Sequence, residues 1–325
     1  MKWLLLLVLT LVIAAIVLVF YGATFFLNVA LDRQSKWYQN KGHQLMNPDN
    51  FKKAPTKYSQ IESRQQSEGR TFWESEFAED HWLQVNQTKL YARLFHPFPE
   101  SSRWVICVHG YRSTGKRDMS YIALRFAEEG YNVLVPDLRA HGKSSGETIG
   151  MGWLDRLDLL RWISYVISLN DQAEIVLMGG SMGAATVMMT SGEKLPYNVK
   201  ALIADCGYTS AYDECQALLR SALQLPAWPI LPLANYLARK KAGYTLKAAS
   251  AVAQLKKNDL PALFIHGTGD QFVPYEMLKE NVAASQGLKE SLTVPGAPHF
   301  SSSIYEPERY FGTIFEFITR YTHIR

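Results

Sequence analysis

The feature that most constrains the fold is an alternation of short apolar runs with longer segments of helical length. Five runs rich in β-branched residues are bounded by Gly, Pro or Asp, and they cover 104–108, 131–135, 174–178, 201–204 and 262–265. Such runs are typical of strands that are buried on both faces of a parallel sheet. Helical-length segments lie between them, at 119–129, 153–169 and 182–194. The pattern predicts an α/β fold with a doubly wound, mostly parallel sheet.

The N-terminus carries a long stretch without charge. No Lys, Arg, Asp or Glu occurs from Trp3 to Leu31. A helix rises about 1.5 Å per residue, so about 20 of these positions span the roughly 30 Å hydrocarbon core of a bilayer. A cleaved signal peptide is the alternative, but its apolar region is usually only about 7–15 residues long. The length therefore favours a retained transmembrane anchor over residues 1–31.

The charges that flank this stretch give only a weak orientation signal. Lys2 and the amino terminus stand on one side, and Arg33, Lys36 and Lys41 stand on the other. The positive-inside rule barely separates the two topologies for such a pattern. By analogy with a signal anchor, we expect a single-pass protein of the cell membrane with a cytoplasmic N-terminus and an extracytoplasmic C-terminal body.

The rest of the chain divides into a connector and one large domain. Residues 32–80 are polar with little periodicity, which predicts a juxtamembrane connector, and 81–325 form the domain, beginning with a hairpin over 83–95. The 34 basic and 30 acidic residues leave a net charge of only +4, and the basic ones are scattered along the chain. Nucleic-acid binding is therefore not expected, because it needs a clustered basic face.

Three cysteines complete the composition argument. Cys107, Cys206 and Cys215 form no CxxC pair and have no Cys/His metal spacing, so no metal site is predicted. Cys107 lies inside an apolar run and is interpreted as a small buried hydrophobic residue. Cys206 and Cys215 could form a disulfide if the domain lies outside the cell. Free thiols are the favoured interpretation.

The motif Gly179-Gly180-Ser181-Met182-Gly183 follows the apolar run that ends at Met178 and precedes a helical segment. A G-x-S-x-G sequence between a strand and a helix is typical of a nucleophile elbow. The turn is so tight that side chains at the two outer glycines would strike neighbouring backbone, and it projects the serine hydroxyl. Ser181 is the predicted nucleophile.

A serine nucleophile needs a base, and the base needs an orienting acid. His299 lies in a loop before the last helix, and Asp270 lies in the glycine-flanked loop after residues 262–267. The chain order Ser181, Asp270, His299 is the order of an α/β-hydrolase triad. Asp205, at the end of the preceding strand, is the rival acid, and its alternative reading is a structural carboxylate.

Two backbone amides are expected to bind the oxyanion. One is the amide of Met182 at the start of the helix, and the other is the amide of Tyr111 in the loop after the first parallel strand. His109 in the same loop is interpreted as a structural brace, because His299 already fills the role of base. The polar loop from Asp137 to Ser144 is interpreted as a hydrogen-bonded scaffold.

These residues resemble the α/β-hydrolase superfamily, in particular bacterial membrane-anchored serine hydrolases of the prolyl-oligopeptidase-like group. The resemblance runs from about Trp82 to the C-terminus and includes the loops at His109 and Asp137, the elbow at Ser181, Asp270 and His299. It implies that the insertion at about 208–246 forms a helical cap over the serine. The apolar residues of that insertion either line an acyl pocket or pack the cap onto the body. They are Leu218, Leu219, Leu223, Leu225, Trp228, Ile230, Leu231, Leu233 and Tyr236.

We therefore expect a serine hydrolase that cleaves a small-molecule carboxylic ester through an acyl-enzyme, without a metal or organic cofactor. An aminopeptidase, a small-peptide hydrolase or a thioester hydrolase on the same triad is the alternative. A substrate ammonium would need an acidic group in the cap, where only Asp213 and Glu214 qualify. A non-catalytic binding protein on this fold is disfavoured by the complete triad. The membrane is an expected partner through the N-terminal helix.

Overall fold

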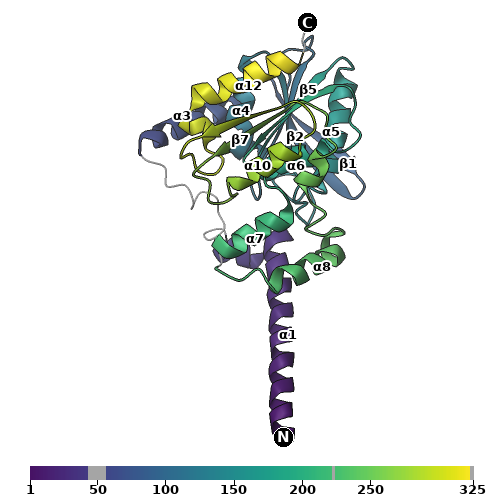
Figure 1. Ribbon diagram of the computed structural model, residues 1–325. Coiled ribbons are helices and arrows are strands. Elements are labelled where there is room, and N and C mark those ends of the chain that lie inside the picture. Colours follow the sequence, from purple (N-terminus) through teal and green to yellow (C-terminus); the bar gives the residue numbers. More distant parts are fainter. Residues whose placement is uncertain (43–55, 222–223, 323–325) are drawn as a thin grey trace.

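The computed structural model describes residues 1–42, 56–221 and 224–322. Within these ranges, an eight-stranded sheet forms the centre of the molecule, in the order β1-β2-β4-β3-β5-β6-β7-β8 (Figure 1). The strands are β1 (Ala78–Val85), β2 (Thr88–Phe95), β3 (Arg103–Val108), β4 (Asn132–Asp137), β5 (Glu174–Gly180), β6 (Val199–Asp205), β7 (Ala262–Gly267) and β8 (Lys289–Val294). Each predicted strand run coincides with one of them, with 131–135 beginning one residue before β4, which confirms the predicted fold class.

The sheet is parallel except around β2. This strand pairs antiparallel with β1 through a tight hairpin, in which Val85 is opposite Thr88, and antiparallel with β4 on its other side. All other neighbouring pairs, from β4–β3 to β7–β8, are parallel. The connection after β3 leads to one side of that strand and the later chain fills the other side. The carboxyl ends of β3 and β5 therefore meet at a topological switch point, where ligands bind in open α/β sheets.

Helices cover both faces of the sheet, and each face has its own apolar core. One core contains residues of α1, α5, α6, α7, α8, α9 and α10, and the other contains residues of α3, α4 and α12. Strand β3 shows why both faces are covered, because Trp104 and Ile106 enter the first core while Val105 and Cys107 enter the second. The helices are α1 (Lys2–Leu31), η1 (Tyr38–Gly42), α3 (Thr56–Trp73), α4 (Gly115–Glu128), α5 (Asp155–Leu169), α6 (Met182–Thr190), α7 (Ala211–Ser221), α8 (Ile230–Ala242), α9 (Ala251–Leu255), α10 (Glu276–Ala284), α11 (Ser302–Tyr305) and α12 (Pro307–Tyr321).

The N-terminal helix has two parts with different surroundings. Figure 1 shows α1 projecting from the body, with α7 and α8 on either side of the point where it emerges. Residues from Trp3 to about Tyr21 are mostly exposed, and the helix is long and apolar enough to cross a membrane. Ala23, Phe26 and Leu31, by contrast, are at most 3% exposed and belong to the core of the body. The last turns of the predicted anchor are thus also part of the folded domain.

Part of the predicted connector is a helix that packs on the body. Residues 56–73 form α3, which lies against α4. Gly69 allows the close approach, because a side chain there would collide with the backbone of Tyr121. Residues 43–55 lie outside the described part of the chain. The division into anchor, connector and domain stays a prediction, to which the structure adds these contacts.

Candidate active site

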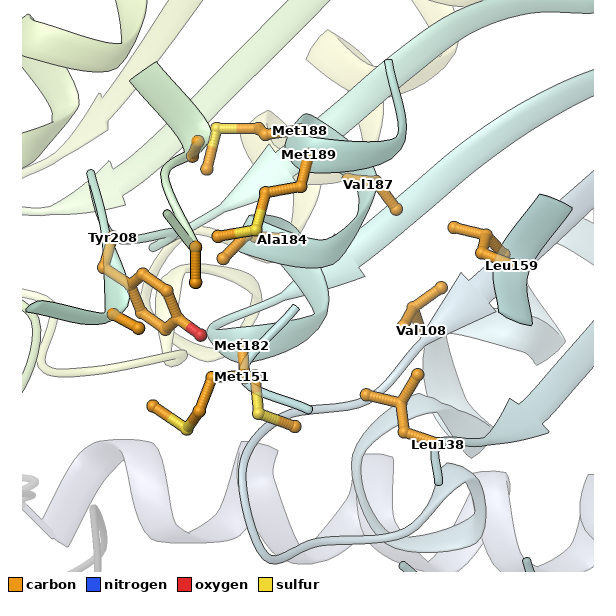
Figure 2. Packing of buried hydrophobic residues seen from close by; sticks show 14 of the residues in the cluster. Val108, Leu138, Met151, Leu159, Met182, Ala184, Val187, Met188, Met189 and Tyr208 are labelled. Atoms are coloured by element: carbon orange, nitrogen blue, oxygen red, sulfur yellow. The ribbon is translucent and has the colours of Figure 1, made fainter. Parts of the chain in front are cut away.

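Ser181 occupies a strained turn between β5 and α6. Its backbone has φ 56° and ψ −119°, which L-residues adopt only at a cost. A side chain at Gly179 would collide with the carbonyl of Gly183, and one at Gly183 would collide with the carbonyl of Val108. Figure 2 shows Val187, on the helix after Ser181, among apolar side chains of other elements, such as Leu159. Close packing on all sides therefore fixes the turn that presents the hydroxyl.

The structure brings Ser181, His299 and Asp270 together. The Ser181 Oγ lies 2.8 Å from His299 Nε2, and His299 Nδ1 lies 2.7 Å from Asp270 Oδ2. In the tautomer that is protonated at Nδ1, His299 donates to Asp270 and leaves Nε2 to accept the serine proton. All three side chains are buried and come from loops at the carboxyl ends of β5, β7 and β8. The spacing of these atoms is that required for nucleophile, base and orienting acid.

Asp270 is held by several donors at once. Its Oδ1 accepts hydrogen bonds of 2.9 Å from the amides of Phe272 and Val273, and its Oδ2 also lies 3.1 Å from His266 Nε2. Burial opposes ionisation of this carboxyl, but the nearby charge of His299 and the hydrogen bonds from the two histidines outweigh it. The pKa of Asp270 is therefore held below its usual value. His266 is a partner of the acid that sequence reasoning did not identify.

Asp205, the rival acid, has a different environment. Its Oδ2 accepts a 3.0 Å hydrogen bond from the hydroxyl of Tyr310, while its Oδ1 is buried without a partner among the described residues. Burial raises the pKa of Asp205 to about 7, against a smaller opposing effect of the Tyr310 hydrogen bond. The histidine that contacts Ser181 contacts Asp270 and not Asp205. The geometry therefore favours Asp270 as the orienting acid.

The two predicted oxyanion amides belong to segments that flank Ser181. Gly110 approaches the serine so closely that a Cβ there would lie 3.3 Å from the Ser181 Cβ. The amide of Gly110 donates to Asp118 Oδ2 at 3.0 Å, and that of Arg112 donates to His141 Nε2 at 3.0 Å. Between them, the amide of Tyr111 donates to no acceptor in the described part of the chain, and neither does that of Met182.

The histidine and aspartate of the neighbouring loops have structural partners. His109 Nε2 accepts a 2.9 Å hydrogen bond from the amide of Leu138, so it joins the loop after β3 to the loop after β4. Asp137 accepts hydrogen bonds from the amides of Gly115 and Lys143, both at 2.8 Å. These contacts place both side chains in the scaffold around the site, as the sequence predicted.

A small cavity adjoins Ser181, and its wall is formed by two helices and several loops. Its volume is about 20 Å³. A space of this size holds about one water molecule. The walls come from α1, from the loops or turns that follow β3, β4, β5, β6 and β7, and from α7 of the insertion. The residues are Phe26, Ala30, Tyr111, Met151, Ser181, Tyr208, Glu214, Cys215, Leu218 and Phe272.

Two polar groups in this cavity wall lack partners. Both carboxylate oxygens of Glu214 and the hydroxyl of Tyr208 are buried without a hydrogen bond among the described residues. Figure 2 shows the Tyr208 ring turned toward Met151 and Met182. Burial, and then the charges of Asp270 and Asp213, raise the pKa of Glu214 well above its usual value. Burial in the closed cavity therefore favours the neutral form of the Glu214 carboxyl.

The apolar residues of the insertion divide among three environments. Leu218 lines the cavity, whereas Leu219 and Leu231 are buried in the core and Ile230 and Leu233 pack against it. Leu225, Trp228 and Tyr236 are exposed. Leu223 lies outside the described residues. Some of these residues therefore line the cavity and others pack the insertion onto the body, as the two interpretations proposed. The exposed residues do neither.

The cysteines are free thiols and all three are buried. Cys206 lies near Asp270 and His299, with ligand atoms within 4.8 Å of one another. Burial, followed by the charges of Asp205 and Asp270, raises the pKa of Cys206 well above its usual value, so the thiol stays protonated. The histidine and carboxylate are already hydrogen-bonded to each other. Cys206 is thus a protonated neighbour of the hydrogen-bonded pair of His299 and Asp270.

Comparison with known proteins gives the class. The family described as alpha/beta hydrolase fold matches residues 103–229. Together with the strand order, this match shows that the chain has the α/β-hydrolase fold.

Individual relatives agree with this class. Protein YqkD of Bacillus subtilis is 29% identical over 226 residues, which are 69% of this chain and 74% of that protein. The Pyrococcus furiosus esterase Pf2001 matches with a TM-score of 0.60 at 22% identity, over 75% of this chain and 92% of its own. Est1E of Butyrivibrio proteoclasticus, solved with ferulic acid bound, gives 0.57 at 20% identity, over 74% and 98%. At these identities the structural likeness establishes the fold.

Proposed function

We propose that this protein is a serine hydrolase that cleaves carboxylic esters through an acyl-enzyme intermediate. Ser181 Oγ attacks the ester carbonyl while His299 Nε2 takes its proton, and Asp270 keeps the imidazole in the tautomer that accepts at Nε2. The C–O bond to the alcohol then breaks, and the alcohol leaves with the proton from His299. Water attacks the acyl-enzyme by the same route and releases the acid. The hydrogen-bonded chain from Ser181 through His299 to Asp270 carries this proposal.

The surroundings of Ser181 support the electrostatic part of the reaction. The amides of Tyr111 and Met182 are proposed to donate to the oxyanion of the tetrahedral intermediate, because each flanks Ser181 and has no other acceptor in the described chain. Removal of one such donor typically costs about 10²–10³ in rate. The strained conformation of Ser181 fixes its hydroxyl relative to both amides.

An ester substrate is favoured by the cavity beside the serine. Its walls are mostly carbon, as suits an acyl or alkyl group. Two of the structural neighbours named above, Pf2001 and Est1E, are an esterase and a protein solved with ferulic acid bound, respectively. We also propose that α1 stays attached as a membrane anchor, because its last turns form part of the core and of the cavity wall.

The test is labelling with a fluorophosphonate probe together with hydrolysis of short p-nitrophenyl esters. Wild-type protein is expected to be labelled and to turn over the esters, and Ser181→Ala is expected to lose both. Ser191→Ala, at the other end of the same helix, is the matched control and should keep both activities. Equal labelling of Ser181→Ala and wild type would contradict the proposal.

Glu214 favours a second candidate, an amide or peptide substrate with a free ammonium group. An ammonium that enters the cavity would lower the pKa of this carboxyl, which would then release its proton to water and pair with the cation as a carboxylate. Glu214→Gln separates the candidates, because the amide has the same shape but cannot carry the charge. A selective loss of about 10-fold or more on aminoacyl substrates, with neutral esters unchanged, would support the second candidate. If Glu214→Gln and wild type have equal rates on aminoacyl substrates and on neutral esters, ester hydrolysis remains the proposed function.

A further inference from the structure

The wall of the cavity beside Ser181 is completed by α1, the helix that is apolar enough to cross a membrane, and not by the insertion alone. Phe26 and Ala30 of α1 face the same space as Leu218 of α7 and Ser181 itself. Phe26 is 3% exposed, so its ring is part of the packed wall. A substrate that occupies this space must therefore contact or displace the end of the helix.

Hydrogen bonds hold that end of α1 to the oxyanion loop. Helix carbonyls of the last turn lack partners within the helix and need others. Here Arg112 Nη2 donates to the carbonyls of Val29 and Asp32, both at 2.8 Å, and the Tyr111 hydroxyl donates to the carbonyl of Ala30 at 2.9 Å. The loop that supplies a proposed oxyanion donor thus also fixes the cavity wall supplied by α1.

The point where α1 leaves the body is surrounded by exposed apolar and basic residues. Ile230, the first residue of α8, reaches Gly22 of α1, which is where the exposed part of α1 begins. Just before and along α8, Trp228 is 77% exposed and Tyr236 is 60% exposed. The last turn of α8 carries Arg239, Lys240 and Lys241, and Lys241 hydrogen-bonds Asn28 of α1.

This combination fits one partner, the surface of a lipid bilayer. Trp and Tyr are enriched where a protein meets the headgroup region, and basic side chains near the surface are attracted to anionic lipids. The exposed apolar part of α1 continues directly from this level (Figure 1). Phe26 and the cavity therefore lie immediately above the expected membrane surface, at the foot of the enzyme body.

We propose that the substrate is an acyl ester of a membrane lipid, whose acyl chain enters from the bilayer between α1 and α7 and ends against Phe26. The inference rests on the proposed esterase function and names its substrate class. The cavity of about 20 Å³ holds no acyl chain as it stands. Entry of the chain therefore separates Phe26 from Leu218, and the size of residue 26 sets the length of chain that fits.

The first experiment uses the full-length protein in detergent micelles with p-nitrophenyl esters of graded acyl length. Phe26→Ala should raise kcat/KM for long esters relative to short ones by about 10-fold or more, because each added methylene that finds room contributes strongly to binding. Phe26→Trp should shift the preference toward shorter esters. Phe25→Ala is the matched control, because Phe25 packs against Trp37 outside the cavity, and its profile should equal that of wild type.

The outcomes distinguish a failure of the proposed esterase function from a failure of the proposed lipid substrate. Wild type without any ester hydrolysis would contradict the proposed function. Active Phe26→Ala and Phe26→Trp variants with an unchanged length profile would overturn the present inference and leave the proposed function standing. The tryptophan variant retains a large apolar side chain, so it tests the idea even if the alanine variant fails to fold.

The second experiment tests the route of entry. Wild type is reconstituted in vesicles of zwitterionic and anionic phospholipid that contain a fluorogenic acyl lipid, with a soluble short ester as internal reference. Trp228→Ser combined with Tyr236→Ser should lower turnover of the lipid relative to the short ester by about 3-fold or more. Tyr197→Ser, an equally exposed aromatic in the loop before β6 at the other end of the strands, should change neither rate. Equal ratios for both variants would overturn entry from the bilayer.

Discussion

Two walls enclose the site at Ser181, and they hold their buried carboxyl groups in opposite ways. On the sheet side, Asp270 accepts from two backbone amides and contacts two histidines, and its pKa is lowered. On the side of the insertion and α1, Glu214 has no partner among the described residues, and its pKa is raised. Fixed hydrogen-bond donors hold a carboxylate in its charged form and in one orientation. A buried carboxyl without donors favours its neutral form and is free to bind a ligand. We therefore propose that the first wall serves catalysis and the second contacts the substrate.

The largest expected effect comes from breaking the sheet-side wall. Asp270→Asn should lower kcat for short esters by about 10⁴, because an amide at this position no longer favours the reactive tautomer of His299. Steady-state kinetics measure the change. Asp205→Asn is the matched control at the end of the adjacent strand, and it should cost less than about 10-fold because Asp205 does not contact His299. A larger loss for Asp205→Asn than for Asp270→Asn would reverse the assignment of the acid.

The next effect concerns the attachment of α1. Arg112→Met should lower the free energy of unfolding by about 2–3 kcal/mol, because the guanidinium bonds to the carbonyls of Val29 and Asp32 are lost. The same variant should lower kcat/KM more for long than for short esters. Denaturant unfolding in detergent and the ester series measure the two effects. Arg70→Met, an exposed position on α3, is the control and should show neither effect. If Arg112→Met leaves both the free energy of unfolding and the ester profile unchanged, Arg112 does not hold α1.

The smallest effect concerns Glu214 and depends on pH. A folded-state pKa above the ordinary value means that the native protein binds the proton more tightly than the unfolded chain does, so stability falls as pH rises above the ordinary glutamate pKa. Glu214→Met removes this penalty and should stabilise the protein on the order of 1 kcal/mol at pH 8, with a smaller gain at pH 5. Asp270 has the opposite sign, because its lowered pKa adds stability above the ordinary aspartate pKa that is lost as pH falls. Thermal unfolding at the two pH values compares them, and a gain that is larger at pH 5 would contradict the account of Glu214.

The same contrast explains what could be predicted from the sequence. The strands, the elbow at Ser181 and the loops of Asp270 and His299 each have a local pattern, and the fold brings the carboxyl ends of parallel strands to one edge. The structure places these three residues together as the pattern required. His266 was missed, although it lies only four residues before Asp270, because a buried strand histidine carries no signal of its partner.

The other wall had no comparable local signal. Nothing in the apolar run up to Leu31 distinguishes Phe26, which faces the cavity, from Phe25, which packs on Trp37. The difference arises only when α1 meets the loop at Arg112, which is remote in sequence. The sequence shows Glu214 as one of two acidic residues in the insertion, but its burial and its lack of a partner among the described residues depend on how α7 packs. Contacts between segments that are distant in sequence determine which residues form this wall, and the hydrophobic periodicity of the sequence does not reveal such contacts.

The most direct test of the central claim is to trap the acyl-enzyme. The protein is mixed with a p-nitrophenyl ester, quenched in acid during turnover and digested, and the acylated peptide is located by mass spectrometry. The account predicts that the added acyl mass maps to Ser181 and is absent from Ser181→Ala. An adduct on another residue, or continued turnover in Ser181→Ala, would contradict it.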